Sequence, residues 1–407
     1  MVSLYSRIRF IMNILYLAHR IPFPPNKGDK IRSFHQIKHL SKNHNLYLAC
    51  LVDDQDDFQH IDELKKMCCV VETDYRSTWN QLLPTGKAFL RGEALSTGAF
   101  YSQALQQKIE AILESVSIDR IMTFSSPMAE YVRTVTHIPK LMDFVDLDSE
   151  KWGAYAEYQS FPFSTLYRME ARRLRLYEET IAKEFNQSVF ISSEEAEAFR
   201  SRVPGHPVAV VPNGVDFEFF SPSGSGGSEG KGPPTVVFTA AMDYFPNIDG
   251  AQFFCEKVLP RILDAVPGVC FFIVGRNPTP KVLQLARTGI VEVTGTVPDV
   301  RPYLENASLA VAPLRIARGV QNKILEAMAM GLPVIGTSNA FQGIAATAKD
   351  GIRIDDDPKG FADEVITLLH DHELRRVCGQ RAREFVSQRC RWNDCGADLE
   401  SLIQNIG

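Results

Sequence analysis

Short, continuous apolar runs alternate with segments of helical spacing along almost the entire chain. In the first half, the apolar runs are Met12–Ala18, Asn45–Val52, Cys69–Glu72, Arg120–Phe124, Lys140–Val145, Ser188–Ile191 and Val208–Val211. Between the first two runs, Asp29–Ser41 places its apolar residues on one stripe, which is typical of an amphipathic helix. Strands that are apolar throughout and alternate with helices predict a parallel sheet that is covered on both faces.

One low-complexity segment interrupts this pattern. Ser221–Pro234 reads SPSGSGGSEGKGPP and contains nothing that can build a core, so it is a linker or an exposed loop. The alternation then restarts with the apolar runs Thr235–Ala240, Cys270–Gly275, Ile290–Thr294, Leu309–Pro313, Pro333–Gly336 and Ile352–Ile354. For 407 residues we therefore expect two Rossmann-like α/β domains, 12–215 and 235–390, with a linker at 216–234. A helix at 391–407 would end the chain and could pack back on the first domain.

The composition narrows the class of protein. With 44 Lys and Arg against 49 Asp and Glu, the net charge of −5 argues against a dedicated nucleic-acid binder. No apolar run reaches 18 residues, and the first apolar stretch ends at His19-Arg20 without a small-residue cleavage site. We therefore expect neither a membrane span nor a signal peptide. The 8 cysteines form no CxxC pair and no zinc-ligand spacing, which favours reduced thiols in a cytoplasmic protein.

The segment Ala312–Gly336 carries the most chemical information. A strand is followed by a loop with glycine, and then by a helix from Gln321 that Gly331 ends. In parallel sheets, ligands bind beyond the carboxyl ends of the strands, and free N–H groups at a helix start favour a diphosphate. Lys323 and Glu326 share one face of this helix, which suits a phosphate and two sugar hydroxyls. The alternative is an ordinary amphipathic helix with an exposed Lys–Glu pair.

A second loop with these properties is Pro24–Arg32, after the first strand. Gly28 allows close approach of a ligand, Asp29 can cap the helix, and Lys27, Lys30 and Arg32 surround its start. The alternative is a plain strand-to-helix turn. Farther along, Val211–Asp216 reads VPNGVD, a tight turn whose position suits a hinge.

Several of these segments together resemble one family. They are MNILYLAHRIPFPPNKGD, VPNGVD, FFIVG, VTGTVPDV and KILEAMAMGLPVIG. The chain is similar over nearly its whole length to GT-B glycosyltransferases of family 4. Through FTAAMDYFPN and ARGVQNKILEAMAMG it most resembles the sugar transferases associated with bacterial exopolysaccharide and exosortase (PEP-CTERM) loci. The resemblance implies the GT-B fold, in which two Rossmann-like domains with parallel sheets face a central cleft.

The resemblance also implies an activity and a set of binding residues. The activity is transfer of a sugar, with retention, from a nucleoside-diphosphate sugar to a glycan or lipid-linked acceptor in exopolysaccharide biosynthesis, without a metal or other cofactor. Glu326 would hold the ribose, and the amides of residues 319–322 with Lys323 would hold the diphosphate and the donor sugar. The full donor-side set is Gly28, Gly275, Arg276, Val297, Arg318, Gly319, Val320, Gln321, Asn322, Lys323 and Glu326.

The sequence departs from the family pattern at two places. The usual first glutamate, eight residues before Glu326, is Arg318 here, and the Gly-Arg…Lys phosphate clamp is missing, with Met242 and Asn247 near those positions. Arg318, Lys323 and Arg276 would then supply the cations. Two alternatives therefore stay open: a catalytically degenerate nucleotide-sugar-binding partner protein, and a GT-B nucleotide-sugar epimerase or hydrolase.

The candidates on the acceptor side are less well defined. Relatives often place a histidine near the anomeric carbon, whereas the corresponding strand end here carries Ser125 and Ser126. We predict Asp146, His19 and Ser126 as the catalytic candidates, although a lone histidine at a strand end is more often structural. Asp146-Leu-Asp148 matches a DxD tripeptide, but in a chain of this α/β pattern we expect no metal site.

One basic helix has two interpretations. In 166–183, Arg168, Arg172 and Arg175 share a face beside Glu170, Glu178 and Glu179. This can be a solvated face, or a patch that contacts anionic lipid. The second interpretation would place a cytoplasmic protein in peripheral contact with the inner membrane.

Overall fold

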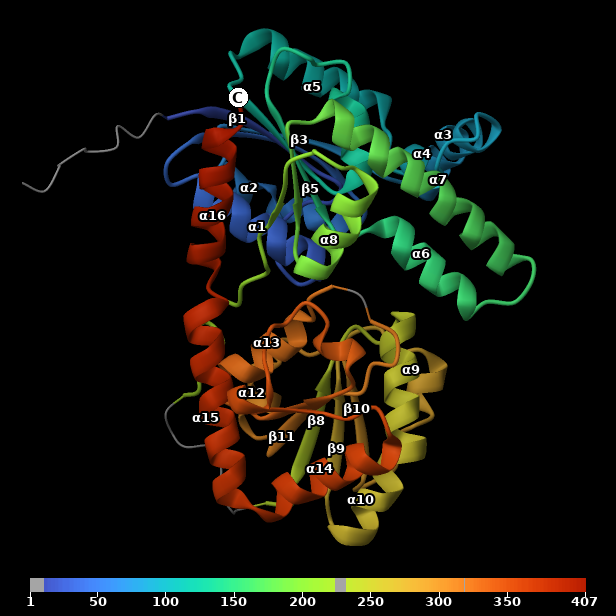
Figure 1. Ribbon diagram of the computed structural model, residues 1–407, viewed down its shortest axis with the longest axis vertical. Helices are drawn as coiled ribbons and strands as arrows, with labels where there is room; N and C mark the ends of the chain where they lie inside the picture. The colour runs from blue at the N-terminus through green and yellow to red at the C-terminus, as the bar shows by residue number, and fades with distance from the viewer. Residues whose placement is uncertain (1–10, 224–231, 318) are drawn as a thin grey trace, which may run out of the picture. The chain divides into compact units, whose positions relative to one another are not determined.

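The computed structural model describes residues 11–223, 232–317 and 319–407. The chain divides into two compact units, which Figure 1 colours from blue to red along the sequence. The N-terminal unit comprises the residues up to Pro212 together with Asn393–Gly407, and the C-terminal unit comprises Asn213–Trp392. Arg318 and the centre of the Ser/Gly-rich segment, 224–231, lie outside the described residues.

The N-terminal unit is an α/β layer structure. Its strands are β1 (Asn13–Ala18), β2 (Asn45–Val52), β3 (Val70–Tyr75), β4 (Arg120–Phe124), β5 (Lys140–Val145), β6 (Gln187–Phe190) and β7 (Val208–Val210). Its helices are α1 (Gly28–Leu40), α2 (Ile61–Lys65), α3 (Thr78–Leu90), α4 (Leu95–Ala99), α5 (Gln103–Ser115), α6 (Asp148–Glu157), α7 (Phe163–Glu184) and α8 (Ser193–Arg202), with 3₁₀ turns at Gln55–His60 and Ser126–Val132.

These seven strands form one parallel sheet in the order β3-β2-β1-β4-β5-β6-β7. β1 lies between β2 and β4, so the order reverses there, and Leu17 pairs with Ala49 on one side and with Thr123 on the other. The residues Leu15–Ala18 are completely buried, as a strand covered on both faces requires. The reversal makes the carboxyl edge beside β1 the expected ligand-binding edge of this sheet.

The C-terminal unit repeats the architecture with six strands. They are β8 (Thr235–Thr239), β9 (Cys270–Val274), β10 (Val291–Gly295), β11 (Leu309–Ala312), β12 (Val334–Gly336) and β13 (Ile352–Ile354), all parallel in the order β10-β9-β8-β11-β12-β13. Its helices are α9 (Phe245–Phe253), α10 (Leu259–Ala265), α11 (Pro280–Leu283), α12 (Arg301–Glu305), α13 (Asn322–Ala329), α14 (Pro358–His370) and α15 (His372–Arg389), with a π-helical turn at Phe254–Val258 and 3₁₀ turns at Asn339–Phe341 and Ala348–Asp350. Figure 1 shows α9 and α13 on opposite sides of this sheet. Here the strand order reverses between β8 and β11.

The last helix, α16 (Trp392–Asn405), belongs with the N-terminal unit from Asn393 onward. Its Glu400 carboxylate accepts a hydrogen bond from Asn43 Nδ2 at 3.0 Å and lies 3.0 Å from His39 Nε2. Arg120 Nε donates to the Ile403 carbonyl oxygen at 3.1 Å. These contacts attach the C-terminus to α1 and β4, far away in the sequence.

The fold class expected from the sequence is confirmed, since both sheets are parallel and alternate with helices. Each expected strand coincides with an observed one, but β3 continues to Tyr75, three residues beyond the expected end. Its last residues are polar yet remain paired in register with β2, because an edge strand is only partly buried. The charged helical region after Glu373 is two helices, α15 and α16, interrupted at Cys390 and Arg391.

Candidate functional site

The predicted diphosphate site lies at the start of α13 in the C-terminal unit. β11 ends at Ala312, and the chain passes through Gly319, whose φ of 66° is left-handed, before α13 begins at Asn322. Gln321 is the N-cap residue, but its side chain donates to the Gly319 carbonyl oxygen and makes no cap hydrogen bond to the helix. The N–H groups of the first turn are therefore not capped by this residue, which suits an anion.

Lys323 and Glu326 lie on the first turns of α13, and both are partly exposed. Lys323 Nζ donates to Asn247 Oδ1 at 2.7 Å and lies 5.4 Å from the centre of the Phe238 ring. Protein surrounds most of each side chain, and this burial lowers the pKa of Lys323 to about 8 although Glu326 opposes the change. Burial likewise raises the pKa of Glu326 to about 7, although Lys323 opposes it. An anion beside Lys323 would therefore stabilise its charged form.

Asn247 connects Lys323 to the loop after β8. Asn247 is buried, and its Nδ2 donates to the Ala241 carbonyl oxygen at 2.8 Å while its Oδ1 accepts from Lys323. Met242, the other residue near the missing phosphate clamp, is buried in the core. A single asparagine at a helix start is a weak sequence signal, so this role of Asn247 does not follow from the sequence. The structure identifies it as the residue that orients the lysine.

The predicted donor residues Gly275, Arg276 and Val297 follow β9 and β10 at the same edge of the sheet. A Cβ atom at Gly275 would lie 1.6 Å from the Ala240 carbonyl oxygen, so glycine permits the ends of β8 and β9 to approach. The Arg276 carbonyl oxygen accepts from the N–H of Met242 at 2.9 Å, and Val297 packs against the core. The structure thus brings these residues and the start of α13 to one edge.

The VPNGVD segment contributes a contact that the sequence did not reveal. Asn213 Nδ2 donates to Asn322 Oδ1, in the first turn of α13, at 3.0 Å. A Cβ atom at Gly214 would lie 2.5 Å from the backbone nitrogen of Trp392, and Val215 N–H donates to the Cys390 carbonyl oxygen at 2.8 Å. The chain therefore enters and leaves the C-terminal unit through two adjacent segments, and the first of them contacts α13.

In the N-terminal unit, His19 lies at the carboxyl end of β1. Its Nε2 lies 3.2 Å from Asp29 Oδ2, which also accepts from Arg20 Nη1 at 2.7 Å. Burial alone would raise the pKa of Asp29, but the hydrogen bonds and charges of His19 and Arg20 hold it well below its ordinary value. Asp29 is therefore an ionised partner of His19, and it makes no N-cap hydrogen bond, because the N-cap residue of α1 is Lys27.

The candidates Ser126 and Asp146 follow β4 and β5, the next two strands along this edge. Each is preceded by a non-glycine residue with left-handed backbone, Ser125 with φ 74° and Val145 with φ 68°. Such conformations cost about 1–3 kcal/mol and gather at functional sites. Ser126 Oγ is buried without a hydrogen-bond partner among the described residues. Burial raises the pKa of Asp146, with the charge of Lys151 opposing it.

The expectation that Lys30 and Arg32 surround a ligand at the start of α1 is wrong. Both side chains are buried, and Lys30 Nζ is paired with Asp57. Arg32 Nε donates to Asp143 Oδ2 at 2.9 Å. A buried cation needs a carboxylate partner, so these charges hold α1 in place. Gly28 is exposed at the start of α1, and its contact with a donor stays a prediction.

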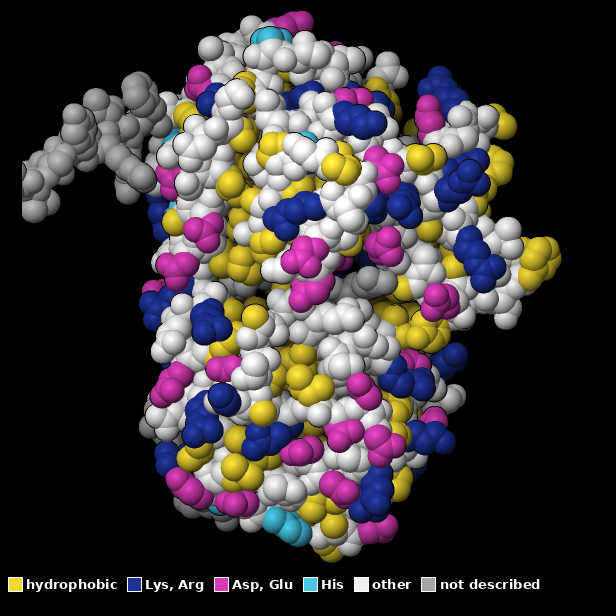
Figure 2. Space-filling model, in the orientation of Figure 1, with side chains coloured by type: hydrophobic (Ala, Val, Ile, Leu, Met, Phe, Trp, Pro, Cys, Tyr) yellow, Lys and Arg dark blue, Asp and Glu magenta, His cyan; other side chains and the backbone are white. Residues whose placement is uncertain are grey.

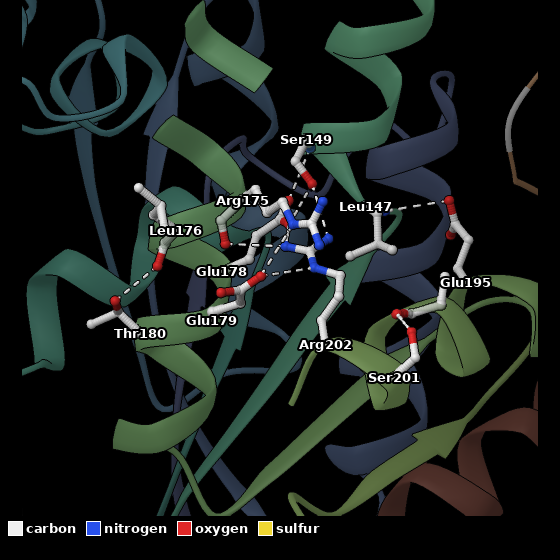
Figure 3. Close-up of polar contacts among 11 residues, drawn as sticks. Leu147, Ser149, Arg175, Leu176, Glu178, Glu179, Thr180, Glu195, Ser201 and Arg202 are labelled. Carbon is white, nitrogen blue, oxygen red and sulfur yellow. Dashed lines mark hydrogen bonds and ion pairs between the residues drawn. The ribbon is translucent and has the colours of Figure 1, made fainter. Parts of the chain in front are cut away.

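The basic helix α7 also differs from the expectation of a solvated face. Glu170 and Glu178 are buried. Glu170 accepts from the N–H groups of Leu95 and Ser96, in the first turn of α4, at 2.8 and 2.9 Å. Glu178 accepts from the N–H of Ser149, in the first turn of α6, at 2.9 Å (Figure 3). Because carboxylates stabilise helix N-termini, α7 fixes the starts of two helices.

Arg202 of α8 completes the contacts around Glu178, as Figure 3 shows. Its Nη2 donates to Glu178 Oε2 at 2.8 Å, and its Nε donates to Glu179 Oε1 at 3.2 Å. Burial raises the pKa of Glu178 to about 7, although hydrogen bonds from Ser149 and the charge of Arg202 oppose the change. The cluster is structural and includes no predicted catalytic residue.

The three arginines of the predicted basic patch differ in their contacts. Arg175 Nε donates to Glu179 Oε1 at 3.3 Å. Arg168 and Arg172 are exposed on α7. No three His, Cys, Asp or Glu side chains in the described parts of the chain are grouped so that they could hold a metal ion. Among the helices of those same parts, none has the length and apolar character required to cross a membrane.

Comparison with known proteins agrees with the family resemblance. Residues 233–371, within the C-terminal unit, match the family described as "Glycosyl transferases group 1". A curated relative is the GDP-mannose-dependent alpha-(1-6)-phosphatidylinositol monomannoside mannosyltransferase of Mycobacterium tuberculosis, 28% identical over 238 residues, which are 53% of this chain and 60% of the relative. The chain spans only 22% to 60% of the length of the curated relatives that it matches.

Solved structures share the fold over almost the whole chain. Sucrose-phosphate synthase of Thermosynechococcus elongatus superimposes with a TM-score of 0.74 at 16% identity, covering 97% of this chain and 98% of the other. Anabaena HepE in complex with UDP and glucose superimposes with a TM-score of 0.68 at 15% identity, covering 97% and 99%. The fold is therefore that of GT-B glycosyltransferase structures.

Proposed function

We propose that this protein is a glycosyltransferase that takes its sugar from a nucleoside-diphosphate donor, which the C-terminal unit binds. The observation that carries the proposal is the start of α13, where helix N–H groups lie beside Lys323 and Glu326 at the carboxyl edge of a parallel sheet. The group 1 match of residues 233–371 supports it. The UDP and glucose in the HepE structure and the GDP-mannose in the mannosyltransferase's name point to the same class of donor.

Each donor-side residue has a role in this proposal. The amides of residues 319–322 and Lys323 bind the diphosphate, while Glu326 accepts hydrogen bonds from the ribose hydroxyls. Gly275, Arg276 and Val297 line the base. Negative charge grows on the diphosphate as the sugar leaves, so a fixed cation and oriented N–H groups lower the barrier to transfer. Arg318 stands where relatives have a glutamate, and we propose that it adds a further cation near the donor sugar.

We propose that the N-terminal unit binds the acceptor at the carboxyl ends of β1, β4 and β5. His19, Ser126 and Asp146 follow these strands. Ser126 and Asp146 are each preceded by a residue with left-handed backbone. As the family resemblance implies, transfer would proceed with retention and without a metal or other cofactor.

We further propose a glycan or lipid-linked acceptor, in exopolysaccharide biosynthesis, and peripheral contact of a cytoplasmic protein with the inner membrane. The phosphatidylinositol monomannoside in the relative's name supports a lipid-linked acceptor. The N-terminal unit also exposes large apolar side chains on α3 and at the start of α7, among them Leu83, Leu90 and Phe161, which are 76%, 85% and 83% exposed. Figure 2 shows hydrophobic side chains beside Lys and Arg where Figure 1 places these helices. Such a surface fits anionic lipid.

The donor proposal is tested by titrating UDP, GDP and ADP into the protein and by measuring release of nucleoside diphosphate from the corresponding nucleotide sugars. Glu326→Ala should weaken nucleotide binding by about 1–3 kcal/mol, because charged hydrogen bonds to hydroxyls are lost. Glu256→Ala removes an exposed carboxylate from the same unit and should leave the affinity unchanged. Equal affinities for all three proteins would contradict the role of Glu326.

The same measurements separate the alternative functions. Transfer of label from the sugar to a lipid or glycan acceptor supports the transferase. Release of free sugar without transfer indicates a hydrolase, and conversion of the sugar within the nucleotide indicates an epimerase. Nucleotide binding with no change in the donor indicates a degenerate binding partner, for which Arg318 in place of glutamate is the sequence argument.

The membrane proposal is tested by flotation with phosphatidylglycerol–phosphatidylcholine vesicles. Arg168→Ala/Arg172→Ala should reduce the vesicle-bound fraction at low salt, and Leu83→Ser/Leu90→Ser should reduce it at all salt concentrations, because salt screens only charges. Arg261→Ala, an exposed arginine of the C-terminal unit, is the control. Equal binding of all variants would refute this surface.

A further inference from the structure

Arg76 is a cation at the carboxyl edge of the N-terminal sheet that no carboxylate pairs with among the described residues. It directly follows β3, and its guanidinium carbon lies 4.1 Å from the centre of the Phe100 ring. Its Nε atom is buried and has no hydrogen-bond partner in the described chain. An arginine stacked on a ring presents its N–H groups around the rim of the guanidinium plane. Among the described residues, Nε–H at least is therefore available to a ligand.

Arg20, a neighbouring arginine at this edge, is paired with carboxylates. Arg20 follows β1, and it binds Asp29 at 2.7 Å and Asp53 at 3.0 Å. Asp29 and Asp53 therefore already contact Arg20, and neither forms an ion pair with Arg76 in the part of the chain that the structure describes. Burial and the charge of Arg20 lower the pKa of Arg76, with Asp53 opposing them. The excess positive charge at this edge thus resides at Arg76.

The Phe100 ring, on which Arg76 stacks, also contacts the acceptor-side candidate His19. The centroids of the Phe100 and His19 rings are 5.5 Å apart in an edge-on arrangement. The Phe100 carbonyl oxygen accepts from the Tyr131 hydroxyl at 2.8 Å, and that hydroxyl in turn accepts from the N–H of Ser102 at 2.7 Å. Arg76 and His19 therefore contact the same ring, Phe100, which we call the aromatic wall.

Two further polar atoms near this wall are also buried without partners in the described part of the protein. They are Asp53 Oδ1 and His19 Nδ1. Because His19 Nε2 faces the ionised Asp29 carboxylate, Nδ1 is the ring nitrogen left for a ligand. One cationic donor, one carboxylate oxygen and one imidazole nitrogen thus lie at the ends of adjacent strands. Leaving such groups buried without partners is costly, which is typical of a site that binds a polar ligand.

We propose that Arg76 binds an anionic group of the acceptor, a phosphate or a carboxylate, while Asp53 and His19 form hydrogen bonds with its hydroxyls. This inference rests on the proposed glycosyltransferase function and adds the chemical class of the acceptor. Guanidinium groups bind phosphate and carboxylate in a two-point geometry that a neutral sugar cannot provide. The acceptor therefore carries a phosphate or a carboxylate, either on its sugar or, for a lipid-linked acceptor, on the lipid headgroup.

The test measures binding of inorganic phosphate to the full chain by ³¹P NMR at constant ionic strength, with UDP titrated in a separate experiment. Arg76→Ala should weaken phosphate binding at least about tenfold, the loss of a charge-assisted contact, and Arg76→Lys should retain part of it. Arg91→Ala, an exposed arginine that follows α3, should bind phosphate like the wild type. Lys323→Ala should lose UDP affinity and keep the Arg76-dependent phosphate signal.

The outcomes are distinguishable. Equal phosphate binding by the wild type and both Arg76 variants overturns this inference, whatever UDP does. Failure of the wild type to bind UDP overturns the proposed donor site and leaves the Arg76 result to stand by itself. Displacement of phosphate by phosphatidylglycerol vesicles identifies a lipid headgroup as the source of the anion, and displacement by glucose 6-phosphate but not by vesicles identifies a soluble one. A purely structural role for Arg76 would lower the unfolding temperature without changing the phosphate affinity of the folded Arg76→Lys protein.

Discussion

The two units share one architecture but bury different chemistry. Among the described residues of the N-terminal unit, eight charged side chains are buried: Lys30, Arg32, Asp57, Lys140, Asp143, Glu170, Glu178 and Glu195. In the described residues of the C-terminal unit, the buried polar side chains are all neutral: Asn213, Thr239, Asn247 and Thr337. Its candidate site depends on backbone N–H groups, on glycine contacts and on apolar packing. Similar folds can therefore position their loops by ion pairs or by close approach of the backbone.

This difference predicts which substitutions damage each unit. In the N-terminal unit, removal of one partner leaves a buried charge without compensation, so single deletions should be costly. In the C-terminal unit, ion pairs lie at the surface and should contribute little, whereas added atoms at close backbone contacts should be costly.

The largest effect is expected at Asp143, at the centre of the buried network of the N-terminal unit. Its Oδ2 accepts from Arg32 Nε at 2.9 Å and from Gln36 Nε2 at 2.7 Å, and its Oδ1 accepts from the N–H of Val145 at 3.0 Å. Asp143→Ala should lower the free energy of unfolding by about 3–5 kcal/mol, because Arg32 stays buried without its partner. Urea denaturation measures this change.

The matched control removes an ion pair of the other unit. Asp363 lies 2.8 Å from Arg261, and both side chains are about half exposed. Asp363→Ala should change the free energy of unfolding by less than about 1 kcal/mol. Asp143→Asn, which keeps hydrogen-bonding capacity, covers the case in which the alanine variant does not fold. If both Asp143 variants lost less than about 1 kcal/mol in the free energy of unfolding, the expected difference between the two units would be wrong.

A pH experiment examines the second buried carboxyl network of the N-terminal unit. The pKa of Glu178 is raised from 4.5 to about 7 in the folded protein, mainly by burial. Between these values the folded state binds more protons than the unfolded state, so the contribution of Glu178 to stability is complete below pH 4.5 and is lost as the pH rises to 7. The stability difference between the wild type and Glu178→Gln should therefore shift by up to about 3 kcal/mol over this range. Urea denaturation at several pH values measures it, and parallel pH profiles for the two proteins would refute it.

The same contrast explains what the sequence could predict. The strands and the start of α13 follow from local patterns, namely continuous apolar runs, Gly331 after a helix and turn residues between elements. The C-terminal unit is built mostly from such local features, and Lys323 and Glu326 were correctly expected at the start of one helix. The buried ion pairs of the N-terminal unit resist this reasoning, because their partners lie far apart in the chain. Arg32 meets Asp143 across 111 positions, and no spacing rule relates the two.

The errors have the same cause. Glu170 and Glu178 read as a solvated face, since their spacing fits a charged helix surface. They are buried because they accept hydrogen bonds from the starts of α4 and α6, and Glu170 meets Ser96 across 74 positions. Asn213 and Asn322, 109 positions apart, were likewise beyond local patterns. Arg76 had no motif at all, and its unpaired state is visible only once its neighbours are known.

A third experiment probes the backbone contacts of the C-terminal unit. Gly275→Ala would place a Cβ atom 1.6 Å from the Ala240 carbonyl oxygen, so the ends of β8 and β9 would have to separate. We expect a loss of about 1–3 kcal/mol in the free energy of unfolding, as for other overpacked sites. Gly232→Ala, where no atom lies within 4 Å of the added carbon, is the control and should be neutral. Equal stability of the two variants would show that close approach does not position this edge.

The smallest effect concerns the charge of Lys323 and connects the contrast to function. Its pKa is about 8 because burial disfavours the ammonium form, and a bound diphosphate would favour that form and raise the pKa. Nucleotide affinity should therefore be constant just below pH 8 and fall above it, by at most tenfold per pH unit, about 1.4 kcal/mol. Calorimetric titration of UDP from pH 7.5 to about 9.5 in buffers of different ionisation enthalpy measures both the decline and the proton taken up on binding. Lys323→Gln should bind more weakly and show no decline, whereas Lys257→Gln, at an exposed lysine of the same unit, should follow the wild type. A decline that persists in Lys323→Gln would assign the titration to another group and would remove the lysine from the diphosphate site.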